Sequence, residues 1–105
     1  MSNIEKAKEL INLYSNREFG CNVDLSDLHN IGLAYTTLTD EEIPIQISVD
    51  IIDMKLKTWI GGDDYERCEP VNVIDITMED LECLDFDDLI SGWQFYIEDN
   101  IEDYI

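Results

Sequence analysis

The clearest pattern in the chain lies between residues 43 and 60, where two successive segments alternate between apolar and polar side chains. In the first segment the apolar positions are Ile45, Ile47, Val49 and Ile51. In the second segment one face carries Met54, Leu56, Thr58 and Ile60. Alternation with a period of two is typical of strands that bury one face. The segment is therefore predicted to form a β-hairpin.

One register of this hairpin suits both of its faces. Folding the chain at Ile52 and Asp53 places Val49 opposite Leu56 on the core face. The same register places Asp50 opposite Lys55 on the other face, which is expected to meet solvent. Three more pairs follow: Ile51 with Met54, Ile45 with Ile60, and Ser48 with Lys57. Because Ile and Asp are unsuited to a type I′ turn, the loop is expected to exceed two residues.

The segment before the hairpin predicts one helix and one strand. Ser2 and Asn3 can cap a helix that ends near Asn16, and its apolar stripe comprises Ile4, Ala7, Leu10, Ile11 and Tyr14. Residues 24–30 are expected to form a short helical turn, with Leu25 and Leu28 facing inward and Gly32 ending it. Residues 32–39 are rich in strand formers, residues 40–42 read as a turn, and Pro44 is expected to open the next strand.

The segment after the hairpin predicts a further strand and then helices. Residues 65–68 are expected to form a fourth strand, and residues 71–76 an extended segment. Thr77 and Asp80 have the spacing of a capping box, ahead of a buried stripe of Met78, Leu81 and Leu84. Residues 85–88 either bend this helix or cap a second one, which Gly92 is expected to end. A final helix is predicted over residues 93–105, with Trp93, Tyr96 or Ile97, Ile101 and Tyr104 at helical spacing.

These elements predict a single domain over residues 1–105 with an α+β fold. The expected architecture is an antiparallel three- to four-stranded β-meander with an N-terminal helix and C-terminal helices. A chain of 105 residues buries enough surface for one core without metal or disulfide support. It contains no run of about 18 apolar residues and no signal-peptide pattern, so a cytoplasmic location is expected.

The charge of the chain changes this picture of an ordinary small domain. It contains 25 acidic and 6 basic residues, which gives a formal net charge of −19, whereas a small domain typically carries about 2–8 net charges. The charges are also segregated, since no Lys or Arg follows Arg67 and twelve Asp or Glu residues do. Carboxylates three or four positions apart on a helix lie about 5–6 Å apart at Cβ. Such rows resemble the closely spaced phosphates of a nucleic-acid strand.

The base-free segment therefore supplies the candidate partner-binding residues. They are Glu79, Glu82, Asp85, Asp87, Asp88, Glu98 and Glu102. The expected partner is a basic nucleic-acid-binding protein, while direct contact with nucleic acid or with an anionic membrane is not expected. The alternative is a merely solvated acidic face. Trp59 and Trp93 are candidate interface anchors, although Trp93 falls in a helical stripe and is expected in the core.

Residues that carry metal or catalytic chemistry are sparse. Cys21, Cys68 and Cys83 are widely spaced and include no CxxC pair, so neither a zinc site nor a disulfide framework is expected. His29 stands alone in the sequence. A surface or capping role is expected for it, because general acid–base catalysis needs a partner within hydrogen-bond reach.

Residues 85–88 also have a partial likeness to a calcium-binding loop. Asp85, Asp87 and Asp88 resemble the start of such a loop, but Ile90 stands where the loop requires Gly and no Glu occupies the twelfth position. No Walker loop or nucleophile elbow is present in the sequence. The chain is accordingly expected to have no catalytic residues, no metal and no cofactor.

In size, extreme acidity and expected mixture of helices and sheet, the chain resembles anti-CRISPR proteins and other phage-encoded nucleic-acid mimics. The resemblance covers bulk properties of the whole chain and includes no motif, so it assigns no residue a role. It implies a non-enzymatic inhibitor that fills the basic nucleic-acid channel of a bacterial defence nuclease, such as a Cas effector. The same charge also fits an immunity protein or antitoxin that neutralises a nuclease toxin. A third interpretation is an acidic structural or adaptor subunit.

The net charge generates a prediction about stability. Raising the ionic strength from about 0.01 M to about 0.15 M shortens the Debye length from about 30 Å to about 8 Å. Since repulsion among 25 carboxylates opposes folding, Tm at neutral pH should rise over this range in a thermal melt followed by circular dichroism. A Tm that falls steadily instead would show that repulsion does not limit the fold.

Overall fold

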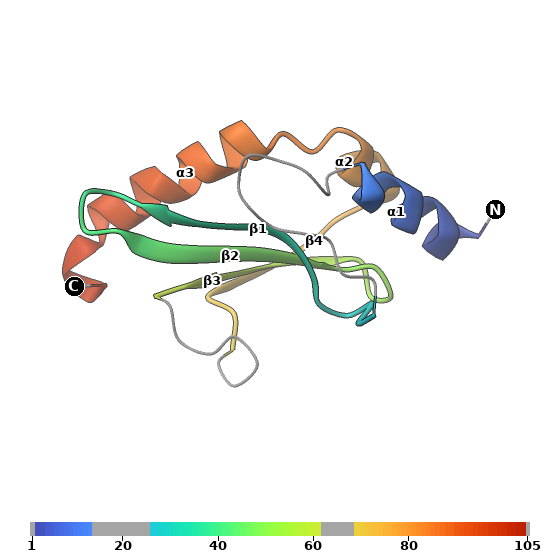
Figure 1. Ribbon diagram of the computed structural model, residues 1–105, viewed down its shortest axis with the longest axis horizontal. Helices are drawn as coiled ribbons and strands as arrows, with labels where there is room; N and C mark the ends of the chain where they lie inside the picture. The colour runs from blue at the N-terminus through green and yellow to red at the C-terminus, as the bar shows by residue number, and fades with distance from the viewer. Residues whose placement is uncertain (1, 14–25, 62–68, 105) are drawn as a thin grey trace.

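The protein forms a four-stranded antiparallel sheet with helices packed on one of its faces (Figure 1). This computed structural model describes residues 2–13, 26–61 and 69–104. Its elements, in chain order, are α1 (Asn3–Asn12), β1 (Ile31–Leu38), β2 (Ile43–Asp50), β3 (Lys55–Ile60), β4 (Asn72–Asp75), α2 (Met78–Glu82), α3 (Phe86–Asp99) and the 3-10 helix η1 (Ile101–Asp103). The strand order β1-β2-β3-β4 confirms the predicted α+β fold with a β-meander.

The hairpin of β2 and β3 has the predicted register. Val49 pairs with Leu56, Ile45 with Ile60, and Asp50 with Lys55. The connecting loop spans residues 51–54, which confirms that it exceeds two residues. Met54 adopts a φ of 56° as the loop returns to β3. The apolar pattern of both segments therefore determines their pairing, because a shift by one residue would expose every core side chain.

The second face of the hairpin differs from the prediction. Ser48 and Asp50, expected in solvent, are 0% and 2% exposed, and Trp59 is 9% exposed. Asp50 is buried because the turn before β1 brings His29 over its carboxylate. The ion pairs also differ, because Lys55 bonds Asp75 of the adjacent β4 whereas Lys57 lies 3.6 Å from Asp50. The predicted register is therefore correct, but the second face of the hairpin is partly buried instead of fully exposed to solvent.

The core lies between the sheet and the helices. Its sheet side contains Ile45, Ile47 and Val49 of β2 with Leu56 of β3, all at most 3% exposed. The helices contribute buried residues at helical spacing: Ala7 and Ile11 from α1, Leu81 from α2, and Phe86, Ile90 and Ile97 from α3. Burial of apolar surface stabilises the fold by about 25 cal/mol per Å². This single layer is the main source of stability available to the chain.

The helix ends follow from short-range capping. Ser2 accepts a hydrogen bond from the backbone of Glu5 and caps α1. Thr77 and Asp80 form the predicted capping box of α2, with reciprocal bonds of 3.0 and 3.1 Å. Asp85 accepts from the backbone of Asp88 and begins a new helix, so the second of the two alternatives for residues 85–88 holds. Capping of this kind typically contributes about 1 kcal/mol.

The prediction that Gly92 ends a helix is wrong. Helix α3 continues through Gly92 to Asp99, and a 3-10 turn follows in place of the separate final helix. The apolar spacing explains this, because Phe86, Ile90 and Ile97 stay on one buried stripe across the glycine. Their packing outweighs the roughly 1 kcal/mol that a glycine costs within a helix. Ile97 rather than Tyr96 is the buried member of this stripe.

The remaining differences are local. Residues 26–30 form a single turn closed by a bond of 3.2 Å from Asn30 N–H to the carbonyl of Asp27, whereas Gly32 lies inside β1 and Pro44 is the second residue of β2. The extended segment expected over residues 71–76 is confirmed as β4. Tyr14, Asn16, Leu25 and the strand expected over residues 65–68 lie outside the described residues. Within the described ranges, no helix has both the length and the apolar composition needed to cross a bilayer.

The hairpin generates a prediction about stability. Leu56 is 3% exposed, so Leu56→Ala should lower the free energy of unfolding by about 2–5 kcal/mol in a urea titration. Val73→Ala is the matched control on the next strand, since Val73 is 48% exposed and its truncation should cost less than about 1 kcal/mol. Similar losses in the two variants would contradict the assigned core face.

Candidate functional site

The acidic segment presents its carboxylates to solvent throughout its length. All twelve Asp and Glu residues between positions 69 and 103 are exposed. Two of them form ion pairs within the described residues, Glu82 with Lys6 of α1 and Asp75 with Lys55 of β3. Helices α2 and α3 fix the positions of most of the others. The segment is therefore a rigid display of negative charge rather than a flexible acidic tail.

The seven predicted site residues fall into two separate groups. Glu79 and Glu82 lie on α2, and Asp85, Asp87 and Asp88 lie at the start of α3. Glu98 and Glu102 lie at the opposite end of α3 and in η1. The rise of an α-helix places Asp88 and Glu98 about 15 Å apart along the axis. Between them the outer face of α3 carries the uncharged residues Ser91, Gln94 and Phe95, so the predicted set is not one continuous surface.

The first group has a structural explanation. Asp85 caps α3 through a bond of 3.2 Å from the backbone of Asp88. Glu82 is held 2.8 Å from the ammonium of Lys6. Glu79, Asp87 and Asp88 lie in the first turns of their helices. A negative charge is favourable there because the helix dipole is positive at its N-terminus. The fold alone therefore accounts for carboxylates at these positions.

The second group lacks such an explanation. Glu98 and Asp99 occupy the last turn of α3, and η1 adds Glu102 and Asp103. The last turn of α3 contains no basic residue. Carboxylates at a helix C-terminus face the negative end of the dipole, which typically costs about 0.3–1 kcal/mol each. Glu98 and Asp99 therefore lie where the dipole of α3 disfavours them, although Gln94 donates a hydrogen bond of 3.3 Å to Glu98.

The β1–β2 turn adds further negative charge to this end of the molecule. Asp40 and Glu41 line a hollow of about 270 Å³ together with Gln94, Glu98 and Ile101. Figure 1 shows this turn beside the C-terminal end of α3. We call Asp40, Glu41, Glu98, Asp99, Glu102 and Asp103 the C-terminal acidic cluster. No sequence pattern links the turn to the helix, because more than 50 residues separate them along the chain.

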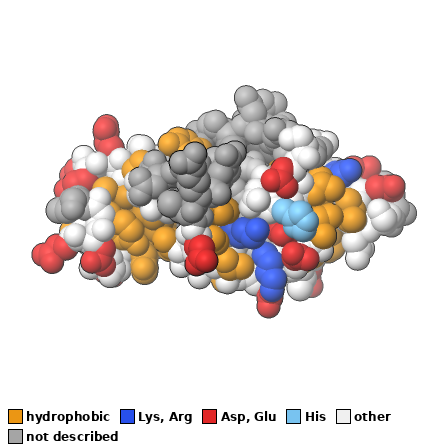
Figure 2. All heavy atoms as spheres, turned by 90° about the horizontal axis from the view of Figure 1, so that it is seen from below, with side chains coloured by type: hydrophobic (Ala, Val, Ile, Leu, Met, Phe, Trp, Pro, Cys, Tyr) orange, Lys and Arg blue, Asp and Glu red, His pale blue; other side chains and the backbone are white. Residues whose placement is uncertain are grey.

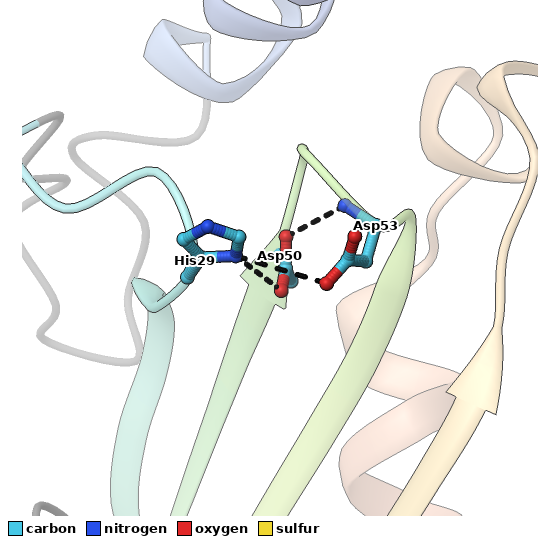
Figure 3. Close-up of side chains that lie close together, drawn as sticks. All are labelled: His29, Asp50 and Asp53. Carbon is cyan, nitrogen blue, oxygen red and sulfur yellow. Dashed lines mark hydrogen bonds and ion pairs between the residues drawn. The ribbon is translucent and has the colours of Figure 1, made fainter.

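A second polar site lies on the opposite face of the sheet, and the sequence did not predict it. His29 Nδ1 lies 2.8 Å from Asp50 Oδ2 and 3.9 Å from Asp53 Oδ2 (Figure 3). An ionised carboxylate only accepts hydrogen bonds, so the imidazole Nδ1–H donates. Figure 2 shows the single histidine on this underside, next to lysine side chains. No local pattern indicates this contact, because His29 and Asp50 are 21 positions apart.

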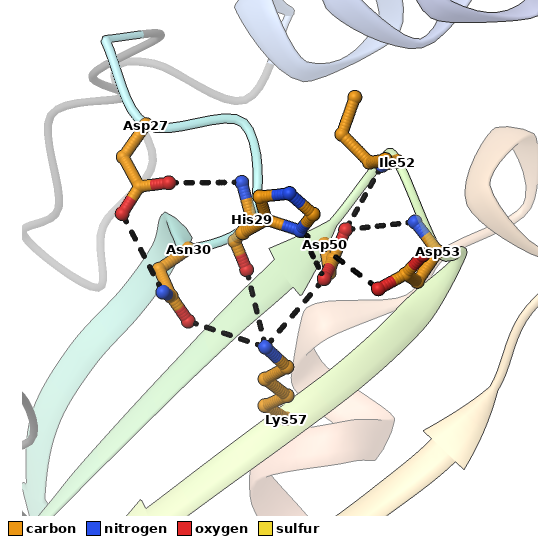
Figure 4. Close-up of polar contacts among 7 residues, drawn as sticks. All are labelled: Asp27, His29, Asn30, Asp50, Ile52, Asp53 and Lys57. Atoms are coloured by element: carbon orange, nitrogen blue, oxygen red, sulfur yellow. Dashed lines mark hydrogen bonds and ion pairs between the residues drawn. The ribbon is translucent and has the colours of Figure 1, made fainter.

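Asp50 is the centre of this network (Figure 4). Its Oδ1 accepts from the backbone N–H groups of Ile52 and Asp53, at 2.9 and 2.8 Å. Burial alone would raise the pKa of Asp50, but these two hydrogen bonds and the one from His29 outweigh it and lower the pKa below 3.8. The hydrogen bond and the negative charge of Asp50 raise the pKa of His29 above 6.5. Each partner therefore favours the charged form of the other.

Lys57 connects the same network to the segment before β1. Its ammonium donates to the carbonyl of His29 at 3.3 Å and to Oδ1 of Asn30 at 3.4 Å. Asp27 accepts from the backbone N–H of His29 at 3.0 Å, and Ile51 donates to the carbonyl of Leu28 at 3.0 Å. Together these bonds join residues 27–30 to the β2–β3 loop. We call this network, centred on His29, Asp50 and Lys57, the clasp, because it joins two segments of the fold.

The chemistry open to this clasp is limited by its own contacts. With Nδ1 bound to Asp50, the Nε2 of His29 is the nitrogen left to exchange a proton. His29, Asp50 and Asp53 place one ligand atom each within 4.8 Å of one another, which is a spacing that a metal ion can bridge. Lys57 lies 3.6 Å from the Asp50 oxygen on that side, and its positive charge opposes a second cation. The contacts therefore favour a protonated histidine in a salt bridge over a bound metal.

No protein family, curated protein or solved structure with which the chain was compared matches it. Its function is therefore inferred from its own residues. Two features are available for that inference: the clasp around Asp50, and the exposed acidic segment, whose C-terminal acidic cluster forms no ion pair with Lys or Arg of the described residues. The acidic segment is exposed to solvent and available to a partner, whereas the side chains of the clasp bond to one another within the fold.

The clasp generates a prediction about pH. The stability that protonated His29 contributes is fully present below its unfolded pKa of about 6.5 and is lost as the pH rises through its raised folded pKa. His29 is the only histidine, so one proton resonance reports its titration by NMR. Its midpoint should lie above 6.5 and fall in Asp50→Asn. His29→Gln should remove the part of the Tm decrease that occurs between about pH 6 and about pH 8. A midpoint at or below 6.5 in the native protein would contradict the salt bridge.

Proposed function

We propose that the protein is an inhibitor that binds the basic nucleic-acid channel of a bacterial defence nuclease and competes there with nucleic acid. Charge complementarity supports the basic channel as the target, because a net charge of −19 attracts a cationic surface and repels nucleic acid itself. The nuclease is proposed from the resemblance to phage-encoded acidic inhibitors. The chain acts in this proposal as a binding protein without a reaction of its own.

The observation that carries the proposal is the C-terminal acidic cluster. Its six carboxylates are all exposed. Among the described residues, none of the six forms an ion pair with Lys or Arg. Four of them oppose the dipole of α3 or follow directly after its negative end. A cost of this kind is expected where a surface serves binding rather than stability.

The dimensions of the acidic segment fit the proposed target. Helix α3 has 14 residues and is therefore about 21 Å long. It carries carboxylates at both ends, as Asp87 and Asp88 begin it and Glu98 and Asp99 end it. Duplex DNA carries one charge per about 1.7 Å of axis when both strands are counted, so about twelve phosphates, about six on each strand, occupy a comparable length. Both groups can contact basic side chains of one channel.

The proposal predicts that removing carboxylates at the C-terminal end of α3 weakens binding more than removing carboxylates at the helix starts. Glu98→Gln with Glu102→Gln removes two charges from the C-terminal acidic cluster. Because these charges meet basic side chains in the complex and disfavour the helix end, the variant should bind at least about tenfold more weakly and melt at a higher temperature. Glu79→Gln with Asp87→Asn should weaken binding less and lower Tm, since these charges favour their helix starts.

The matched control is Glu5→Gln with Glu9→Gln on α1, which removes the same charge from an exposed face that also carries Lys6 and Lys8. Competition is measured by fluorescence anisotropy of labelled DNA on purified nucleases, including guide-RNA effectors and toxin nucleases, at two salt concentrations. The variants are compared only on those nucleases from which the native protein displaces the labelled DNA. Equal losses in the control and in the C-terminal variant would refute the assigned surface. Simultaneous binding of DNA and this protein by each nuclease would refute the competitive mechanism.

A further inference from the structure

A hollow of a different character lies on the side of α3 that faces β4. Its volume is about 370 Å³, and its lining is mostly apolar: Asn72, Asp88, Leu89, Gly92, Trp93 and Tyr96. Gly92 contributes to the space, because a Cβ built on it would meet no atom within 4 Å. Along α3 the hollow extends from Asp88 of the first acidic group toward the C-terminal acidic cluster. Aromatic pockets surrounded by polar residues are where interfaces concentrate their binding energy.

Two aromatic rings form one wall of this hollow. Trp93 and Tyr96 pack edge to face, with ring centroids 5.3 Å apart and planes at 81°. Trp93 is partly buried against the core, whereas Tyr96 remains 45% exposed. An edge-to-face pair leaves at least one ring face free of the other ring, and that face carries the negative part of the aromatic quadrupole. Such a face attracts cations, Trp most strongly.

The remaining lining residues supply a charge and a neutral acceptor. Asp88 is exposed at the first turn of α3 and adds a carboxylate to the lining of the hollow. Asn72, the first residue of β4, adds a side-chain amide that can accept a hydrogen bond. A ring face together with a carboxylate is the environment that suits a planar cation, which can stack on the ring while it bonds to the carboxylate.

We propose that this hollow binds an arginine side chain of the basic partner, with the guanidinium stacked on Trp93 or Tyr96 and paired with Asp88. The inference rests on the proposed function, since it names the group through which the partner is anchored. An apolar side chain would leave the Asp88 carboxylate without a partner. A lysine ammonium would bond the carboxylate but could not stack as a plane. The surrounding negative charge also favours a cationic occupant.

The test uses the intact protein and a free probe, so it needs no identified partner. Nα-acetyl-arginine amide is titrated into labelled protein, and the indole N–H of Trp93 and the amide of Gly92 are followed by NMR. The signals should shift saturably with a Kd on the order of millimolar. The uncharged isostere Nα-acetyl-citrulline amide should bind about tenfold more weakly, and Nα-acetyl-lysine amide should also bind more weakly. Equal binding by citrulline or lysine would overturn the assignment to a guanidinium.

Two pairs of variants locate the site. Asp88→Asn should weaken arginine binding about fivefold or more, while Asp87→Asn removes the same charge from a neighbouring residue outside the hollow and should change it less than about twofold. Gly92→Leu adds a side chain at a lining position where a Cβ would meet no atom within 4 Å, and should abolish the shifts, whereas Ser91→Leu on the adjacent exposed position should not. Equal effects within either pair, with both variants folded by circular dichroism, would overturn the proposal.

The outcomes separate this inference from the proposed function. If Gly92→Leu loses arginine binding and yet displaces DNA from the nuclease as well as the native protein does, the anchor is refuted and the inhibitor proposal stands. If arginine binds as expected but no nuclease in the panel is displaced from DNA, the inhibitor proposal fails and the arginine site remains. If Gly92→Leu loses both arginine binding and the ability to displace DNA from the nuclease, the arginine site and the inhibitor proposal are supported together.

Discussion

The structure depends on one apolar layer between the sheet and the helices, because that layer must hold together a chain with a net charge of −19. The core faces of β2 and β3 and the buried stripes of α1, α2 and α3 all meet in it. Electrostatic repulsion opposes every step of compaction, and the described residues offer few ion pairs to relieve it. The hairpin register follows from this constraint, since it is the arrangement that keeps the apolar side chains of both strands on the same buried face.

The carboxylates divide according to whether the fold uses them. Asp50, Asp80 and Asp85 each accept backbone N–H groups, at a loop, within a capping box and at a helix start. Such acids stabilise local structure and offset part of the repulsion. Those of the C-terminal acidic cluster face the wrong end of a helix dipole or lie in a neighbouring turn. The division gives a physical criterion for separating carboxylates that stabilise the fold from carboxylates that do not, which composition alone cannot supply.

The sequence predicted the parts of the fold that local periodicity determines. Alternation gave the hairpin and its register, and the spacing of Thr77 and Asp80 gave the capping box. It failed where long-range packing decides: α3 passes through Gly92 because its buried stripe continues, and Asp50 is buried because His29 lies over it. The candidate site shows the same limit. Its residues were found from charge, but their separation into two groups and the joining of Asp40 and Glu41 to Glu98 are tertiary facts. The sequence pattern predicts a helix end at Gly92, whereas this glycine lines the hollow together with Trp93.

The central claim is that the C-terminal acidic cluster contacts the basic partner, and carboxylate footprinting of the complex tests it most directly. Carbodiimide labelling followed by mass spectrometry reports the accessibility of each Asp and Glu with no mutation and no change in net charge. With a nuclease that the protein displaces from DNA, labelling of Glu98, Asp99 and Glu102 should fall on binding, whereas Glu5 and Glu9 on α1 should label as in the free protein. Protection confined to α1, with the cluster labelled as before, would contradict the account.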